Sequence, residues 1–117
     1  MRSARAAALV LITCSNEEQG ASIARTLLDE RLAACVNIVD QVRSIYRWQG
    51  KIEDDRETLL LVKTGRALLP KVERRVRELH TYDVPEIMAL SFDSGSQRYL
   101  EWLLGAVSQS RRKSTKS

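Results

Sequence analysis

The sequence predicts an α+β sandwich whose elements follow the order β-α-β-β-α-β-α. Residues 6–14 are almost all apolar, which is typical of a central strand. Three later segments repeat apolar residues at three- and four-residue spacing, as on the buried face of a helix. Residues 35–48 instead alternate at a spacing of two, and a second extended segment follows them. This is the split β-α-β, ferredoxin-like plan with one added helix, which lays two helices on one face of an antiparallel sheet.

The length and charge of the chain favour one domain with a neutral body. A chain of 117 residues fits a single core, which we place at residues 6–109 after a short N-terminal extension, residues 1–5. Residues 110–117 form a basic tail that we expect to be disordered. Four of the 19 basic residues lie in this tail, which leaves 15 against 15 acidic residues in the body. A neutral body argues against a nucleic-acid partner.

The first apolar run also bears on where in the cell the protein is located. Residues 6–12 are too few to span a bilayer, and no small-residue cleavage site follows them, so we interpret them as a strand. The two cysteines, Cys14 and Cys35, are too few for a disulfide framework and suit reduced, largely buried thiols. We therefore expect a cytoplasmic protein with no membrane partner.

Each remaining element has a local signal. Ser15 or Asn16 is a helix cap, followed by acidic residues and an apolar stripe that predicts a helix through about Ala34. A second helix is expected over residues 65–79, with Pro70 in its first turn and His80 at its end. Residues 83–85 form a corner, and residues 86–92 a fourth strand. A last helix is capped by the segment Ser94-Gly95-Ser96, with an inner stripe of Tyr99, Trp102, Leu103 and Ala106.

The two strands that flank Gln49-Gly50 are unusually long. About 13 residues at roughly 3.3 Å each give an arm of about 40 Å, whereas a globule of this size is only about 30 Å across. In residues 36–48 five of the apolar side chains fall on one parity, which predicts one apolar face: Val36, Ile38, Val42, Tyr46 and Trp48. An isolated arm of two strands is marginally stable in water. We therefore expect the arm to pack against other copies of the chain.

Three blocks of sequence carry a resemblance to a known family: ERLAACVN at residues 30–37, SIYRWQGKIE at 44–53 and HTYDVPEI at 80–87. They resemble the signature blocks of the CutA divalent-cation tolerance family, and the likeness extends over about residues 8–107. The resemblance implies a homotrimer in which the long hairpins, between the second and third strands, braid the subunits together. Thr81 departs from the proline that members often carry after the histidine, which implies a less rigid corner.

The same resemblance implies a role in tolerance of divalent metals such as Cu(II), with no obligatory cofactor and no enzymatic activity. The alternative is a trimeric signalling or assembly module, similar to PII proteins, that binds a small ligand or a protein in the clefts between subunits. That step is an analogy of fold. We assign no catalytic or cofactor-binding residues, because the chain has one imidazole and no glycine-rich phosphate loop.

The candidate metal ligands are His80, Glu86 and Cys14. Imidazole and thiolate suit copper and zinc, and a carboxylate can complete a mixed site. Because the fourth strand is expected beside the first and antiparallel to it, Glu86 can approach Cys14, with His80 at the same edge. The alternative for His80 is a histidine that only ends a helix. Glu86 is alternatively a buried carboxylate bonded to backbone N–H groups or to an arginine across the subunit interface. Tyr82 is expected to be a packed aromatic with a bonded hydroxyl.

Overall fold

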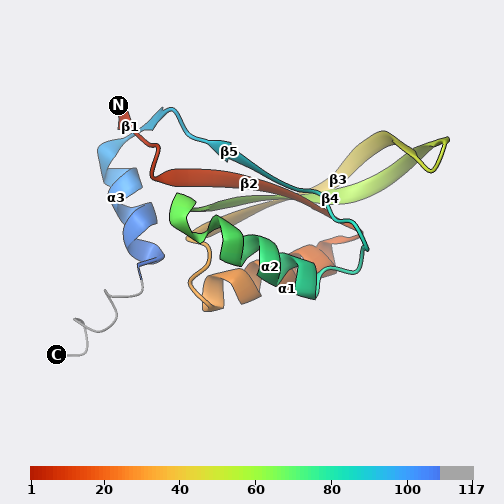
Figure 1. Ribbon diagram of the computed structural model, residues 1–117, viewed down its shortest axis with the longest axis horizontal. Helices are drawn as coiled ribbons and strands as arrows, with labels where there is room; N and C mark the ends of the chain where they lie inside the picture. Colours follow the sequence, from red (N-terminus) through yellow and green to blue (C-terminus); the bar gives the residue numbers. More distant parts are fainter. Residues whose placement is uncertain (109–117) are drawn as a thin grey trace.

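The first apolar run forms β2, Ala7–Cys14, a central strand of a four-stranded antiparallel sheet. The computed structural model describes residues 1–108, so the basic tail predicted at 110–117 lies outside the described residues. The sheet order is β3-β4-β2-β5, with bounds Cys35–Trp48 for β3, Lys51–Gly65 for β4 and Ile87–Ser91 for β5. The predicted α+β class is confirmed, and the fourth strand does lie antiparallel beside the first (Figure 1).

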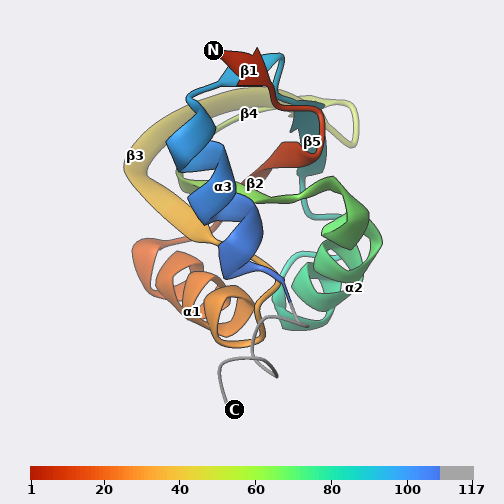
Figure 2. The same ribbon diagram turned by 90° about the vertical axis from the view of Figure 1, so that its left-hand side faces the viewer.

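Two helices cover one face of this sheet, and a third lies across its end. Figure 2 shows α1, Glu17–Asp29, beside α2, Leu69–Leu79, with α3, Gln97–Ala106, in front of them. Alternate side chains of β2 and β4 point toward α1 and α2, and they form the core with the helix stripes: Val10, Ile12, Leu60, Val62, Ile23, Leu27, Val72 and Val76. Each fully buried aliphatic side chain contributes about 1.5–3 kcal/mol, so this layer dominates the stability of the chain.

Helix α1 begins as predicted but ends earlier. The Asn16 side chain accepts a hydrogen bond from the Gln19 N–H at 2.8 Å, as expected of a cap. The helix ends at Asp29 rather than near Ala34, because Arg31 adopts a left-handed backbone with φ of 59°. The Leu32 N–H then donates to the Leu27 carbonyl, and the Arg31 N–H to the Leu28 carbonyl, which is the Schellman ending. The sequence has no glycine at this position, so it gives no signal for the end of the helix.

The hairpin of β3 and β4 extends beyond the body as predicted. The strands stay paired to Trp48 and Lys51, and the molecule measures 55 × 30 × 22 Å (Figure 1). The predicted single apolar face of β3 is wrong, because the register shifts by one residue between Val39 and Val42. The shift moves Val42, Tyr46 and Trp48 to the face opposite Val36 and Ile38.

The second half of the chain follows the predicted order with small differences. Strand β4 runs to Gly65, and a single 3₁₀ turn, η1 at Arg66–Leu68, precedes α2. The Ser96 side chain caps α3, as expected. Leu103 of α3 is buried, but the prediction that Tyr99 and Trp102 face inward is wrong for the single chain. Their side chains are 42% and 50% exposed.

Two short strands pair residues near the N-terminus with the segment that precedes α3. Strand β1, Arg2–Ser3, pairs antiparallel with β6, Ser94–Gly95, which places the predicted N-terminal extension against the segment before α3. The Arg66 guanidinium bonds to the Arg5 carbonyl and to the Ser91 hydroxyl, which fastens the same region to the sheet. None of the helices within residues 1–108 is long and apolar enough to span a bilayer.

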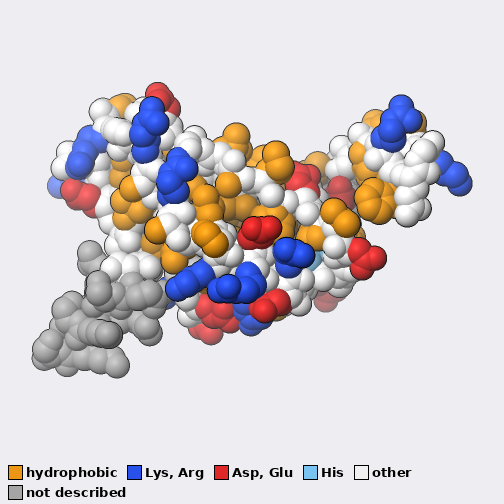
Figure 3. All heavy atoms as spheres, viewed as in Figure 1, with side chains coloured by type: hydrophobic (Ala, Val, Ile, Leu, Met, Phe, Trp, Pro, Cys, Tyr) orange, Lys and Arg blue, Asp and Glu red, His pale blue; other side chains and the backbone are white. Residues whose placement is uncertain are grey.

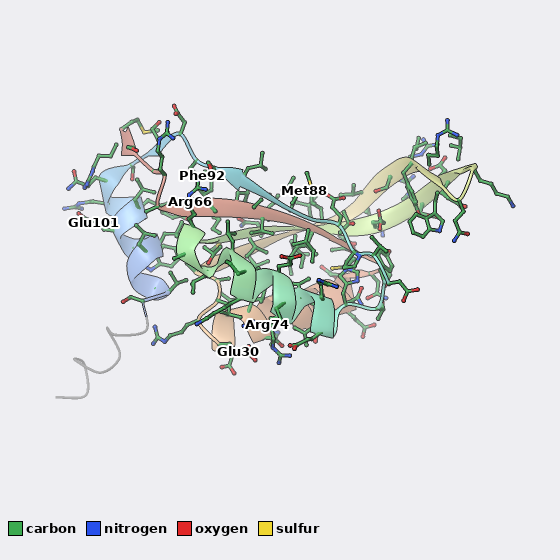
Figure 4. The ribbon with its side chains drawn as sticks, viewed as in Figure 1. Glu30, Arg66, Arg74, Met88, Phe92 and Glu101 are labelled. Carbon is green, nitrogen blue, oxygen red and sulfur yellow. The ribbon has the colours of Figure 1, made fainter. Side chains whose placement is uncertain are left out.

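The face of the sheet opposite α1 and α2 is apolar. Strand register places Leu11 between Leu61 and Met88 on this face, and Leu9 beside Leu90. Met88 and Leu90 are 61% and 50% exposed. Met88 lies on the side away from the helices (Figure 4), and Figure 3 shows hydrophobic side chains there and on the arm. A single copy of the chain therefore exposes two apolar surfaces.

Candidate metal centre

His80 lies where α2 meets the corner that leads to β5. Its backbone N–H donates to the Val76 carbonyl, so it ends the helix as predicted. Its ring is nearly buried and lies 2.7 Å, Nε2 to O, from the Thr13 carbonyl of β2. The Tyr82 backbone N–H donates to Nδ1 at 3.1 Å. Both ring nitrogens therefore have protein partners.

Tyr82 connects His80 to the base of the arm. Its ring packs on the imidazole with centroids 4.7 Å apart, and its hydroxyl donates to the Glu57 carboxylate at 2.9 Å. The prediction of a packed aromatic with a bonded hydroxyl is confirmed. Burial and this hydrogen bond to Glu57 raise the pKa of the Tyr82 hydroxyl well above its ordinary value. Tyr82 therefore stays protonated and acts as a donor to Glu57 at any ordinary pH.

Cys14 is fully buried at the end of β2. Desolvation, with a smaller contribution from the negative charge of Glu57, raises the pKa of its thiol to about 11. The thiol therefore carries its proton at neutral pH, whereas a metal ligand is the thiolate. The expectation of a buried, reduced thiol is confirmed for Cys14, and Cys35 is a half-buried free cysteine.

Glu86 has a different environment. It is exposed, and it directly precedes Ile87, which packs against the core beneath the sheet. The alternative prediction, a carboxylate buried against backbone N–H groups or an arginine across a subunit interface, stays a prediction because it concerns the assembly. Within residues 1–108 no three His, Cys, Asp or Glu side chains gather closely enough to hold a metal ion, so one chain does not assemble the three predicted ligands.

The carboxylate that the fold brings to this edge is Glu57, which was not among the predicted ligands. Strand pairing places Cys14 opposite Thr58, the neighbour of Glu57. Thr81 also has an unforeseen contact, since its hydroxyl accepts a hydrogen bond from the Gln19 side chain at 2.8 Å. This contact ties the corner to α1. Glu57 can be recognised as part of this site only from the register of β2 with β4. The sequence alone does not give that register, because it depends on the whole fold.

A shallow groove of about 660 Å³ runs along the same corner. It lies between α2 and residues 80–85, and its walls include Arg74, Arg77, His80 and Tyr82. Arg75, also on α2, forms a bidentate pair with Glu30, the residue that follows α1 and that Figure 4 labels beside Arg74. The groove presents charges of both signs, because Glu73, Glu78 and Asp83 also line it.

Comparison with known proteins places this geometry in a family. Residues 8–106 match the family model described as CutA1 divalent ion tolerance protein. The chain is 55% identical over 95 residues to the divalent-cation tolerance protein CutA of Thermus thermophilus, which covers 81% of this chain and 92% of that relative. The solved structure of Cut A1 from the same organism has a TM-score of 0.83 at 52% identity, covering 86% of this chain and 97% of that chain.

Relatives from plants and animals show the same similarity. The solved structure of CutA1 from Oryza sativa has a TM-score of 0.85 at 42% identity, covering 88% of this chain and 94% of that one. The CutA proteins of Arabidopsis thaliana and Homo sapiens are each 46% identical, over 81% and 79% of this chain, and the chain spans about half of their length. The matched residues run from β2 to the end of α3. The chain therefore belongs to the CutA1 divalent ion tolerance protein family.

Proposed function

We propose that this chain is a non-enzymatic divalent-cation tolerance protein that works as a homotrimer and binds Cu(II) or a related divalent ion. The observation that carries the proposal is the family match over residues 8–106, supported by 55% identity to a relative named for divalent-cation tolerance. We further propose that it acts in the cytoplasm. The names of some relatives contain the word chloroplastic or periplasmic.

The homotrimer is supported by the surfaces that one copy leaves uncovered. The arm carries exposed Ile45, Trp48 and Ile52, and the open face of the sheet carries Met88 and Leu90. Exposed apolar area of this kind favours burial against other protein. Other copies of the chain are the partners that the arm fits, because an isolated two-stranded arm is marginal in water.

For the metal site we propose His80, Glu86 and Cys14 as ligands. The chemistry of the donors supports this choice, since imidazole, carboxylate and thiolate together suit Cu(II) and Zn(II). With the pKa of Cys14 near 11, recruitment of its sulfur releases a proton. The protein atoms that now bond to His80 compete with the ion, so binding involves a local rearrangement.

Calorimetric titration of Cu(II) and Zn(II) tests the site. We expect stoichiometric binding with a Kd on the order of a micromolar or tighter. His80→Ala should abolish it, and Glu86→Gln and Cys14→Ser should weaken it. Glu101→Gln is the matched control, because it removes an exposed carboxylate from α3, away from the corner. Weak binding that is the same in all variants would contradict the proposal.

The alternative is a trimeric signalling or assembly module, with metal binding incidental, that takes a small ligand or a protein partner in the clefts between subunits. Two observations favour it: both ring nitrogens of His80 are already bonded, and a groove of about 660 Å³ adjoins the ring. Metal titrations that His80→Ala leaves unchanged, together with an intact trimer, would favour this alternative.

The absence of enzymatic activity is also a proposal. General base catalysis at neutral pH most often uses histidine, and the chain has only one. The acceptor nitrogen of His80 already receives the Tyr82 N–H. This arrangement supports a structural or ligating role for the ring over a catalytic one.

A further inference from the structure

The two faces of the arm differ in the side chains that they carry. Beyond the register shift, residues 42–48 of β3 pair with residues 51–57 of β4, and directly opposed residues of an antiparallel pair lie on the same face. One face, which we call the acidic face, holds Val42, Ser44, Tyr46, Trp48, Lys51, Glu53, Asp55 and Glu57. The other, the basic face, holds Arg43, Ile45, Arg47, Ile52, Asp54 and Arg56.

The net charges of the two faces are equal and opposite. Three carboxylates against one ammonium group give the acidic face a charge of −2, and three guanidinium groups against one carboxylate give the basic face +2. Contacts within the chain stay on one face: the Tyr46 hydroxyl donates to Asp55 at 2.6 Å, and Arg43 pairs with Asp54 at 2.7 Å. Within residues 1–108, neither Glu53 nor Arg47 has an ion pair.

Both faces also expose apolar side chains. On the acidic face Tyr46 and Trp48 are 40% and 47% exposed, and on the basic face Ile45 and Ile52 are 60% and 62% exposed. The arm stands clear of the body, so the chain itself covers neither face (Figure 1). A two-stranded ribbon with apolar side chains on both faces is marginal in water. A partner that stabilises the arm must therefore cover two surfaces of opposite charge.

We propose that the arms of neighbouring copies of the chain stack front to back, with the acidic face of one arm against the basic face of the next. The inference rests on the proposed homotrimer and deepens it by naming the two surfaces that meet. Two acidic faces, or two basic faces, would bring like charges together, which costs several kcal/mol across an interface. The opposite faces attract each other and bury the apolar side chains of both.

This pairing also accounts for the kind of symmetry. A contact between two identical faces is isologous and stops at a pair of chains, whereas a contact between two different faces is heterologous and can close into a ring of three. The side chains match in kind as well. Guanidinium groups on the basic face suit both the carboxylates and the aromatic rings of the acidic face, through ion pairs and stacking.

Charge reversal on one face or on both tests the pairing. Glu53→Lys with Asp55→Lys makes both faces positive, and Arg47→Glu with Arg56→Glu makes both negative. We expect either double variant to raise the protein concentration at which half of the trimer dissociates by at least about ten-fold. The chain with all four substitutions has the native net charge and opposite faces again, so it should return to a mass near 40 kDa, three chains of 13.3 kDa.

Two controls separate the faces from total charge and from folding. Asp29→Lys with Glu73→Lys makes the same change in net charge at exposed positions on α1 and α2, and should leave the mass near 40 kDa. Raising NaCl from about 50 mM to about 500 mM should weaken the native trimer and strengthen either double variant, because salt screens attraction and repulsion alike. Circular dichroism follows folding in each sample.

The outcomes distinguish the stacking from the trimer itself. If the native chain is a trimer and the double variants dissociate no more readily than it does, the stacking is overturned and the trimer stands. If the double variants dissociate or unfold and the chain with four substitutions does not reassemble, each face meets some other surface, and the stacking is again overturned. A native chain that is folded at 13.3 kDa removes both proposals.

Discussion

At the scale of single residues, the environment of Cys14 shows how burial sets chemistry. Its side chain lies on the helix-covered face of β2, in the core cluster with Ile12 and Leu60. A thiolate there would lose its hydration and face the negative charge of Glu57, so the thiol keeps its proton and its pKa rises to about 11. Thiol reactivity follows the thiolate form, so Cys14 should be inert in the folded protein.

This inertness can be measured by alkylation at pH 8. With a pKa near 11, only about one thiol in a thousand is ionised at that pH. We expect iodoacetamide to modify native Cys14 at least about 100-fold more slowly than Cys14 of the chain unfolded in urea, whose pKa is ordinary. Mass spectrometry of the cysteine peptides gives both rates. Similar rates in the folded and unfolded protein would contradict the burial of this thiol.

Residue-scale predictions from the sequence succeeded where the cause is local. Asn16 and Ser96 cap their helices because a cap bonds to an N–H three residues ahead. The partners of His80 were not predictable in this way, since Thr13 lies 67 residues away in the chain. The exposure of Trp102 was not predictable either, because helical spacing does not say which surface of α3 finds a neighbour.

At the scale of elements, α1 packs against the sheet through a glycine. A Cβ atom added at Gly20 would lie 3.1 Å from Leu60 Cδ2 and 3.3 Å from Thr58 Cγ2. The helix backbone therefore rests almost directly on β4. A larger residue at position 20 must push the helix from the strand or distort the buried Leu60 side chain.

Gly20→Val should lower the free energy of unfolding by about 1–3 kcal/mol, because an isopropyl group enters a filled space. Ser22→Val is the control: it places the same side chain on the same helix at an exposed position and should change stability by less than about 0.5 kcal/mol. Urea unfolding at one protein concentration measures both. Equal losses in the two variants would mean that α1 does not lie this close to β4.

The tip of the arm depends on backbone conformation instead of packing. Gln49 and Gly50 both have positive φ, 51° and 79°, which is the turn of a two-residue hairpin with the twist of its strands. The sequence indicated this turn through Gln49-Gly50, and it predicted the strand lengths. It carried no signal for the register shift near Gln41, because an extra residue changes parity without changing composition.

Gly50→Ala should destabilise the protein by about 1–2 kcal/mol through backbone strain alone, since no atom lies within 4 Å of the added Cβ. Gly65→Ala is the control, because Gly65 has φ of −86° and its added Cβ meets Val107 at an ordinary 3.6 Å. It should be neutral to within about 0.5 kcal/mol. Denaturant midpoints compare the two, and a neutral Gly50→Ala would contradict the left-handed turn.

At the scale of the whole molecule, the chain is more extended than a compact domain of the same length. The radius of gyration is 15.5 Å, against about 13 Å for a compact domain of this length. The excess lies in the arm, which leaves Ile45, Trp48 and Ile52 exposed. The open face of the sheet adds Met88 and Leu90. The sequence predicted the overhang from strand length, but the exposed sheet face emerged only from the register of β2 with β5.

The proposed trimer depends on these surfaces, and its mass tests it most directly. Sedimentation equilibrium at about 1 μM protein should give a mass near 40 kDa, three times the 13.3 kDa of one chain. Circular dichroism on the same sample should show it folded. A folded species of 13.3 kDa at that concentration would contradict the shared arm, because it would mean that one chain sustains the hairpin alone.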